Sequence, residues 1–128
     1  MGAPFNYDVL DLTDDEVDAE VRVFGALTAA VRRLNEATLR TTVDHDTVED
    51  VRRQIEELTA RLEKSMIPDN FGVSFTKGGR IRGYGNAVVG IRNPNAVPLT
   101  VVQDKVNGRA SAEFELNALH EGPPGQVH

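Results

Sequence analysis

The side chains best suited to chemistry lie at the C-terminal end of the sequence, in Glu121-Gly122-Pro123-Pro124-Gly125-Gln126-Val127-His128. Two glycines and two prolines favour a tight, pre-shaped loop, and a histidine can exchange protons near neutral pH. If this loop leads from a strand into the start of a helix, the free N–H groups there can hold a carbonyl oxygen or a developing oxyanion. The residues alone also allow a disordered proline-glycine terminus, and they do not choose between the two interpretations.

Other kinds of catalytic site find little support in the sequence. The chain has no cysteine, which excludes disulfides, thiolate metal sites and a cysteine nucleophile. His120, Glu121 and His128 carry metal-binding atoms, but their spacing matches no metal motif. The Gly-x-Ser-x-Gly pattern of serine hydrolases is not present, and Lys77-Gly78-Gly79-Arg80 lacks the spacing of a phosphate loop, so we expect a turn there. The sequence therefore predicts neither a metal site nor a cofactor.

The composition limits the classes of partner and the cellular compartment that we expect for this chain. With 128 residues, the chain is long enough for one domain with a modest core. Its formal net charge of -6 argues against nucleic acid and against anionic membranes as partners. The N-terminus lacks the basic start and apolar core of a signal peptide, and no apolar run approaches the length of a membrane span. We therefore expect a cytoplasmic protein.

The first 67 residues carry the signals of two helices. Thr13-Asp14-Asp15-Glu16 fits a capping box, and a second start signal lies at Asp44-His45-Asp46. Each start precedes apolar residues at spacings of three and four, which predicts two amphipathic helices. The first stripe comprises Val17, Val21, Phe24, Leu27, Val31 and Leu34, and the second comprises Val48, Val51, Ile55, Leu58 and Leu62. The second stripe has the spacing of helices that pack along their length, and the short link favours an antiparallel hairpin.

Residues 68–128 read as short strands, because apolar residues alternate there and most of the glycine appears. Asn107-Gly108, between the segments 99–106 and 109–116, is typical of a two-residue type I′ hairpin. That turn predicts that Val101 pairs with Phe114. A hairpin cannot stand alone in water, so the helices, a partner chain or further polypeptide must cover this sheet.

The loop at the C-terminal end resembles a known motif. Gly122-Pro123-Pro124-Gly125-Gln126-Val127-His128, after a predicted strand, resembles the signature loop of PaaI-type hotdog-fold acyl-CoA thioesterases, where it continues as His-Gly-Gly into a central helix. Upstream, the segment Gly90 to Leu99 resembles the N-P-x-x-x-P-L stretch that leads into the first hotdog strand, in the form seen in actinobacterial members. The helical stretch Thr13 to Leu62 is similar to the N-terminal extension of the same group.

The resemblance implies an α+β fold in two parts. Residues 1–67 would form an N-terminal antiparallel helical hairpin, and residues 68–128 a partial antiparallel hotdog-like sheet that lacks its central helix. The implied substrate is an acyl-CoA thioester, and the implied assembly is a homodimer with the active site at the subunit interface. The implied catalytic residue is His128, and the implied substrate-binding residues are Gly122, Pro123, Pro124 and Gly125.

The same resemblance implies that the active site is incomplete in this chain. In the family, glycine N–H groups after the histidine polarise the thioester carbonyl, and an acid on the central helix acts as base or nucleophile. Neither group is present in the sequence, so we expect the isolated chain to be inactive. Two alternatives remain open, namely a non-enzymatic protein-interaction module and a degenerate acyl-binding protein that keeps an apolar groove.

Overall fold

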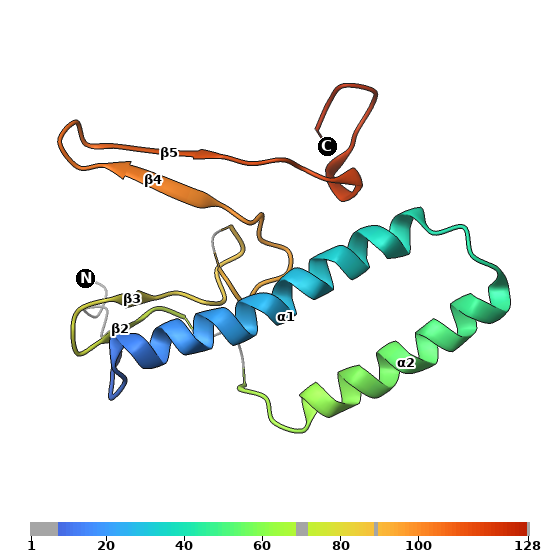
Figure 1. Cartoon of the computed structure of the whole chain (residues 1–128), viewed down its shortest axis with the longest axis horizontal. Helices are drawn as coiled ribbons and strands as arrows, with labels where there is room; N and C mark the ends of the chain where they lie inside the picture. Colours follow the sequence, from blue (N-terminus) through green and yellow to red (C-terminus); the bar gives the residue numbers. More distant parts are fainter. Residues whose placement is uncertain (1–7, 69–71, 89, 128) are drawn as a thin grey trace, which may run out of the picture.

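The computed structural model describes residues 8–68, 72–88 and 90–127 (Figure 1). Within these residues the fold is α+β, with two helices followed by small sheets. The elements in chain order are β1 (Asp8–Leu10), α1 (Asp14–Arg40), α2 (His45–Glu63), β2 (Ser74–Thr76), β3 (Ile81–Arg82), β4 (Thr100–Asp104), β5 (Arg109–Glu113) and a 3-10 turn (Ala118–His120). Neither of the two helices is both long and apolar enough to cross a membrane.

The predicted start of α1 is confirmed in atomic detail. The Thr13 hydroxyl accepts from the Glu16 N–H at 3.2 Å, and the Glu16 carboxylate accepts from the Thr13 N–H at 2.8 Å. This reciprocal pair is the capping box that the sequence indicates. The helix ends at Arg40, where Thr41 turns extended and β-branched residues follow.

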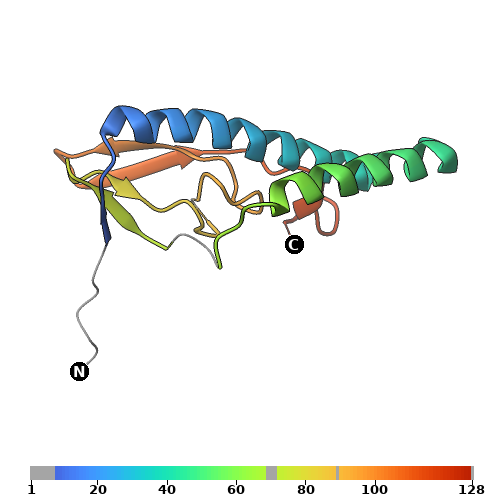
Figure 2. The same ribbon diagram turned by 90° about the horizontal axis from the view of Figure 1, so that it is seen from below.

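Helix α2 also starts where the sequence indicates, but its apolar stripe is not covered. Asp44 caps it by accepting from the Thr47 N–H at 2.9 Å. The chain then runs back in roughly the opposite direction to α1 (Figures 1 and 2). No residue of α2 is buried, so the expectation that the stripe packs along its length is wrong for this structure.

Three short strands form a sheet in the order β1-β2-β3. β1 lies parallel to β2, and β3 lies antiparallel to it. The predicted turn at Lys77–Arg80 joins β2 to β3, and the Gly79 N–H donates to the Thr76 carbonyl at 2.9 Å. Figure 2 shows this sheet against the first half of α1.

The hairpin β4–β5 forms where the sequence predicts it, but in a different register. Val101 pairs with Ala112 rather than with Phe114, and Asp104 pairs with Arg109. The cause is the Asp104 side chain, which accepts from the backbone N–H groups of Val106 and Asn107 at 3.1 and 3.2 Å. These bonds end the strand early and leave a four-residue loop. The shift of two residues keeps each side chain on its expected face.

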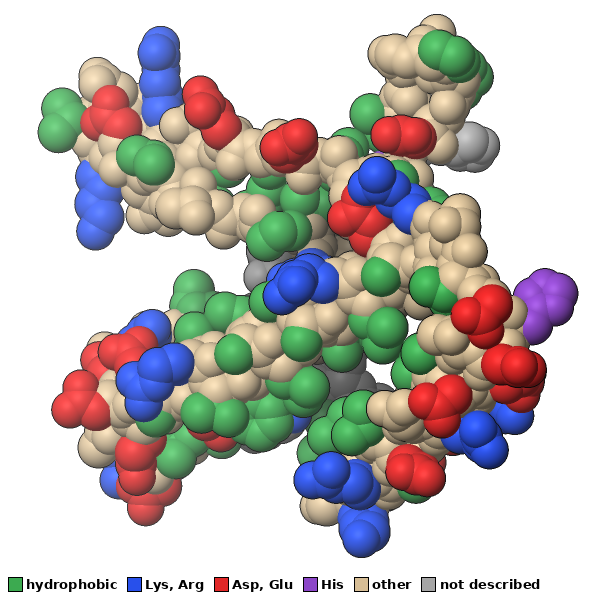
Figure 3. All heavy atoms as spheres, turned by 45° about the vertical axis from the view of Figure 1, so that its right-hand side comes forward, with side chains coloured by type: hydrophobic (Ala, Val, Ile, Leu, Met, Phe, Trp, Pro, Cys, Tyr) green, Lys and Arg blue, Asp and Glu red, His purple; other side chains and the backbone are tan. Residues whose placement is uncertain are grey.

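The core is small. Among the described residues the buried hydrophobic side chains are Val17, Tyr84 and Ala96. The chain exposes 10668 Å² of surface, whereas a compact monomer of this size exposes about 6,700 Å². Figure 3 shows hydrophobic side chains at the surface along both helices. The difference between the exposed surface of this chain and that of a compact monomer is large, so much of its apolar surface is not covered by other parts of the chain.

Candidate functional site

The Gly-Pro-Pro-Gly segment forms a closed turn. The Gln126 N–H donates to the Pro123 carbonyl at 2.9 Å, and the Gly122 N–H donates to the Gln126 carbonyl at 2.9 Å. Gly125 has a φ of 78°, a left-handed value that side chains other than glycine rarely adopt. Proline followed by glycine at the two central positions is the signature of a type II turn. Residues 122–126 therefore form a pre-shaped loop in this structure.

The turn is held in place by the segment before it. Asn117 caps the 3-10 turn by accepting from the Leu119 N–H at 3.1 Å, and this 3-10 turn is among the elements that lie closest to α1. Beyond it, Glu121 and Val127 form an isolated antiparallel bridge that closes the loop. The proline-glycine turn therefore projects from a segment that lies against the second half of α1.

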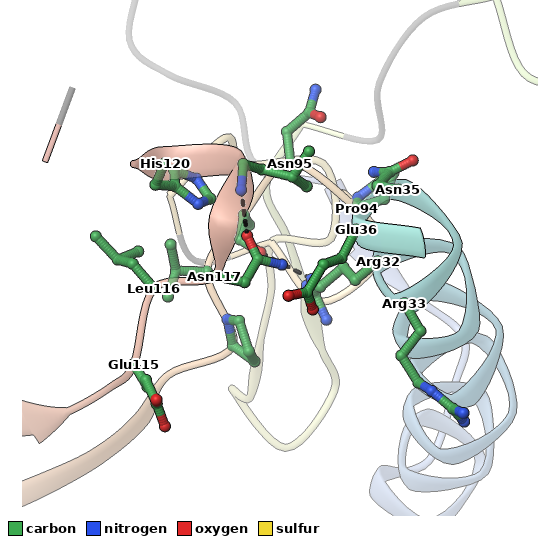
Figure 4. Close-up of a pocket in the computed structure, with 14 residues that line it drawn as sticks. Arg32, Arg33, Asn35, Glu36, Pro94, Asn95, Glu115, Leu116, Asn117 and His120 are labelled. Carbon is green, nitrogen blue, oxygen red and sulfur yellow. Dashed lines mark hydrogen bonds between the residues drawn. The ribbon is translucent and has the colours of Figure 1, made fainter. Parts of the chain in front are cut away.

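A cavity of about 150 Å³ lies where three segments meet. Its walls come from α1, from the turn at 94–98 and from the segment 115–120 (Figure 4). The volume suits a short acyl group or another small molecule, and it is far too small for a whole coenzyme A. Gly122, Pro123, Pro124 and Gly125 are not among its lining residues.

Arg32 fixes one wall of the cavity. Its Nε donates to the Ala96 carbonyl at 2.8 Å, and its Nη2 donates to the Asn93 carbonyl at 3.3 Å. The Asn93 side chain adds a bond from its Nδ2 to the Gly85 carbonyl at 3.1 Å and accepts from the Asn95 N–H at 3.0 Å. Because the guanidinium holds the loop 93–96 against α1, its role here is structural.

His120 lines this cavity and carries a buried ring nitrogen without a hydrogen-bond partner. Its Nδ1 is buried and has no hydrogen-bond partner, an arrangement that costs about 1–3 kcal/mol. A neutral imidazole can accept or donate at that atom, so its hydrogen-bonding capacity is unused in this structure. Figure 4 shows Arg33 and Glu115 pointing away from His120.

A second polar cluster joins α1 to β3. The Arg82 Nε and Nη2 both donate to Glu20 Oε2, at 3.1 and 2.9 Å, and the Tyr84 hydroxyl donates to the same oxygen at 3.1 Å. Burial raises the pKa of the Tyr84 hydroxyl. Burial also lowers the pKa of Arg92, whose guanidinium lies 3.7 Å from the centre of the Phe24 ring.

Sequence reasoning missed this second cluster. The available signal was the alternation Arg80-x-Arg82-x-Tyr84, which places three polar side chains on one face of an extended segment. Arg80 forms an ion pair with Asp18, two residues before Glu20 on α1. The cluster ties the helix to the sheet, and we assign it a structural role.

Two further histidines complete the inventory of candidate groups. His128, the expected catalytic residue, lies outside the described residues. His45 is the first residue of α2 and is exposed. In the part of the chain that the structure describes, no group of three or more histidine, aspartate and glutamate side chains could hold a metal ion.

Comparison with protein-family models, with curated proteins and with solved structures finds no significant match.

Proposed function

We propose that this chain forms one part of an acyl-thioester-binding site of the PaaI type. In this proposal residues 1–67 are a helical-hairpin extension, and residues 68–128 are the start of a hotdog-like sheet that further polypeptide completes. The observation that carries the proposal is the closed turn after the 3-10 segment, because it gives the Gly-Pro-Pro-Gly segment the pre-shaped form that a signature loop needs. Hydrolysis of an acyl-CoA thioester is the activity proposed for the completed site.

The hydrogen bonds of the turn refine the role of its residues. Pro123 and Pro124 have no N–H, and the N–H groups of Gly122 and Gln126 already donate within the turn. The turn therefore shapes the site, and donors for a thioester carbonyl must come from residues after Val127. A base that activates water would likewise have to come from outside the turn, so we expect negligible hydrolysis by this chain alone.

Ligand binding tests the role of the turn. We expect a short-chain acyl-CoA at about a hundred times its dissociation constant to raise the melting temperature by several degrees. Gly125→Ala should abolish that rise, because alanine is strained by about 1–2 kcal/mol at this backbone conformation. The matched control is Gly108→Ala, which places the same strain at a φ of 63° in the β4–β5 loop.

The outcomes of this experiment separate the possibilities. Loss of the ligand shift in Gly125→Ala but not in Gly108→Ala supports the proposal. Equal loss in both variants would show a stability effect, and no shift with the unmodified chain would refute acyl-CoA binding by this chain. Rapid thioester hydrolysis that is unchanged by His128→Ala would contradict the assignment of His128.

A second candidate function, a protein-assembly module, is supported by a different observation. The chain exposes about 4,000 Å² more surface than a compact monomer of its size, and its apolar residues are prominent in that surface. Large exposed apolar patches mark sites of interaction with other proteins. This role needs no thioester chemistry, and it would persist if acyl-CoA does not bind.

A further inference from the structure

A second cavity, of about 410 Å³, lies between α1 and the segment that leads into β4. This volume is within the range of about 300–1,000 Å³ that is usual for small-molecule sites. Its apolar walls include Ile91, Val97, Pro98, Leu99 and Val101. Among the described residues that line it, the charged one is Arg32. The cavity therefore combines hydrocarbon walls with a single cation.

The guanidinium of Arg32 has unused hydrogen-bond donors. It carries five N–H groups, of which Nε donates to the Ala96 carbonyl and Nη2 donates to the Asn93 carbonyl. These two bonds account for its structural role, because they hold the loop 93–96 toward which the side chain reaches from α1 (Figure 4). The other three N–H groups have no acceptor in the part of the chain that the structure describes.

The positive charge of Arg32 also lacks a carboxylate partner within the described residues. None of the ion pairs found there includes Arg32, whereas Arg82 is paired with Glu20 at 2.9 Å. Arg32 is partly buried, and a cation that is withdrawn from water is stable only when an anion or further hydrogen bonds compensate it. A ligand with one negative charge would supply that partner.

We propose that this cavity binds a small organic carboxylate, with its carboxylate group on the unused N–H groups of Arg32 and its hydrocarbon part against the apolar walls. A planar guanidinium suits a carboxylate because two parallel N–H groups meet the two oxygens. The hydrocarbon part gains from removal of its apolar surface from water. The inference does not rest on thioester chemistry, since the ligand is a free acid and none of residues 122–126 lines the cavity.

The charges around Arg32 favour this class of ligand. No aspartate or glutamate is among the described residues that line the larger cavity, whereas Glu36 and Glu115 line the smaller one that shares Arg32. Because a single cation lines the larger cavity, one negative charge is matched better than the charge of about -2 on a phosphate group. The net charge of -6 opposes the ligand only weakly, since charges more than about 8 Å away are largely screened in physiological salt.

The first test compares hexanoate with hexanamide on the unmodified chain by isothermal titration calorimetry. The two probes have nearly the same shape, but only hexanoate is charged at neutral pH. We expect saturable binding at one site, with hexanoate at least about tenfold tighter. Equal affinities would overturn the inference, as would the absence of saturable binding. Tighter binding of coenzyme A than of hexanoate would assign the cation to a phosphate group and would also overturn it.

The second test removes the charge with Arg32→Gln. The preference for hexanoate over hexanamide should fall to about one, whereas loosening of the loop 93–96 alone would weaken both probes equally and leave the preference unchanged. The matched control is Arg33→Gln, which changes the net charge by the same amount at a neighbouring residue that does not line this cavity. A preference that survives Arg32→Gln would overturn the assignment of Arg32.

The third test fills the cavity and leaves Arg32 in place. Gly25 lines the cavity, and a Cβ added there would lie 3.5 Å from the Ile91 side chain, which is ordinary contact. Gly25→Leu should therefore weaken hexanoate binding at least about tenfold. The control is Ala26→Leu at an exposed position of α1 that does not line the cavity. Leucine is a good helix former, so circular dichroism should show that both variants keep their helices.

The outcomes of the third test are distinct from those of the thioester proposal. Equal hexanoate binding by Gly25→Leu and Ala26→Leu would overturn the location of the carboxylate site. The response of the acyl-CoA shift to Gly125→Ala is measured on a different ligand and a different segment, so either proposal can fail while the other stands.

Discussion

The two halves of the helical region are stabilised in different ways. α1 is tied to distant parts of the chain, because Asp14 accepts from the Thr76 hydroxyl at 2.9 Å and Glu20 binds Arg82, residues that lie 62 positions apart in each case. Among the described residues, the side-chain hydrogen bonds of α2 reach no further than four residues. The first helix therefore belongs to a tertiary structure, whereas the second is a locally satisfied helix that presents an apolar face.

The β-structure divides in the same manner. β2 and β3 bury Ser74, Thr76 and Arg82 beneath α1, while every residue of β4 is exposed. The difference teaches that polar contacts, rather than a large apolar core, hold the ordered half of this chain together. It also predicts that substitutions in the two halves will differ sharply in their effects on stability.

The largest expected effect follows from breaking the contact between α1 and β3. Arg82→Ala removes a guanidinium that is 8% exposed and leaves the Glu20 carboxylate, whose side chain is 30% exposed, without its ion-pair partner. We expect the free energy of unfolding to fall by about 3 kcal/mol, measured by urea denaturation. The control is Arg109→Ala on the exposed β5 strand, which should change it by less than about 0.5 kcal/mol. Equal losses would show that the two halves do not differ.

A smaller effect is expected from the apolar contact beneath α1. Val17 is 1% exposed, and Val17→Ala should lower the free energy of unfolding by about 2 kcal/mol through a lost transfer energy and a residual cavity. Val102 is 63% exposed on β4, so Val102→Ala makes the same chemical change with little expected loss. Thermal unfolding of both variants measures this difference. A larger loss of stability in Val102→Ala than in Val17→Ala would contradict the prediction.

The smallest effect concerns pH and the start of α2. The Thr47 N–H and hydroxyl, both bonded to the Asp44 carboxylate, lower the pKa of Asp44. A carboxylate with a lowered folded-state pKa stabilises the helix above its unfolded pKa, and this contribution is lost as the pH falls through the folded-state value. The protection of the amides at the start of α2 against hydrogen exchange, corrected for the intrinsic exchange rate at each pH, should therefore fall below about pH 4.

A neutral cap provides the control for this titration. Asp44→Asn keeps a good capping side chain but removes the charge, so the acid-dependent change at the start of α2 should flatten. Exchange within the central turns of α1, which tertiary contacts hold, should change less over the same range. An acid response that is unchanged in Asp44→Asn would assign the effect to other carboxylates.

The features that the sequence predicted correctly are local ones. Thr13 with Glu16 and Asp44 with Thr47 lie within one helical turn of each other, so their hydrogen bonds depend on little beyond the helix itself. For these two caps, residue type and spacing were sufficient. The closed turn at Gly125 is equally local, but proline and glycine alone did not decide between this turn and a disordered terminus.

The features that escaped prediction depend on contacts across the chain or on competition between side chain and backbone. The face of α1 that contacts β3 and the loop 93–96 carries Glu20 and Arg32. A search for apolar periodicity does not detect these polar residues. The hairpin register was wrong by two residues because the Asp104 carboxylate competes for backbone N–H groups. The cavity was not foreseen because its walls come from three segments far apart in the sequence.

The exposed β4–β5 hairpin has a consequence for the behaviour of the chain in a crowded solution. A two-stranded sheet has two open edges, and each edge presents unpaired N–H and C=O groups to any other extended chain. Charged side chains at Asp104, Arg109 and Glu113 lie along these strands and act as gatekeepers against edge-to-edge stacking. Until a partner covers the hairpin, resistance to aggregation therefore depends on those few charges, and it should weaken as salt screens them.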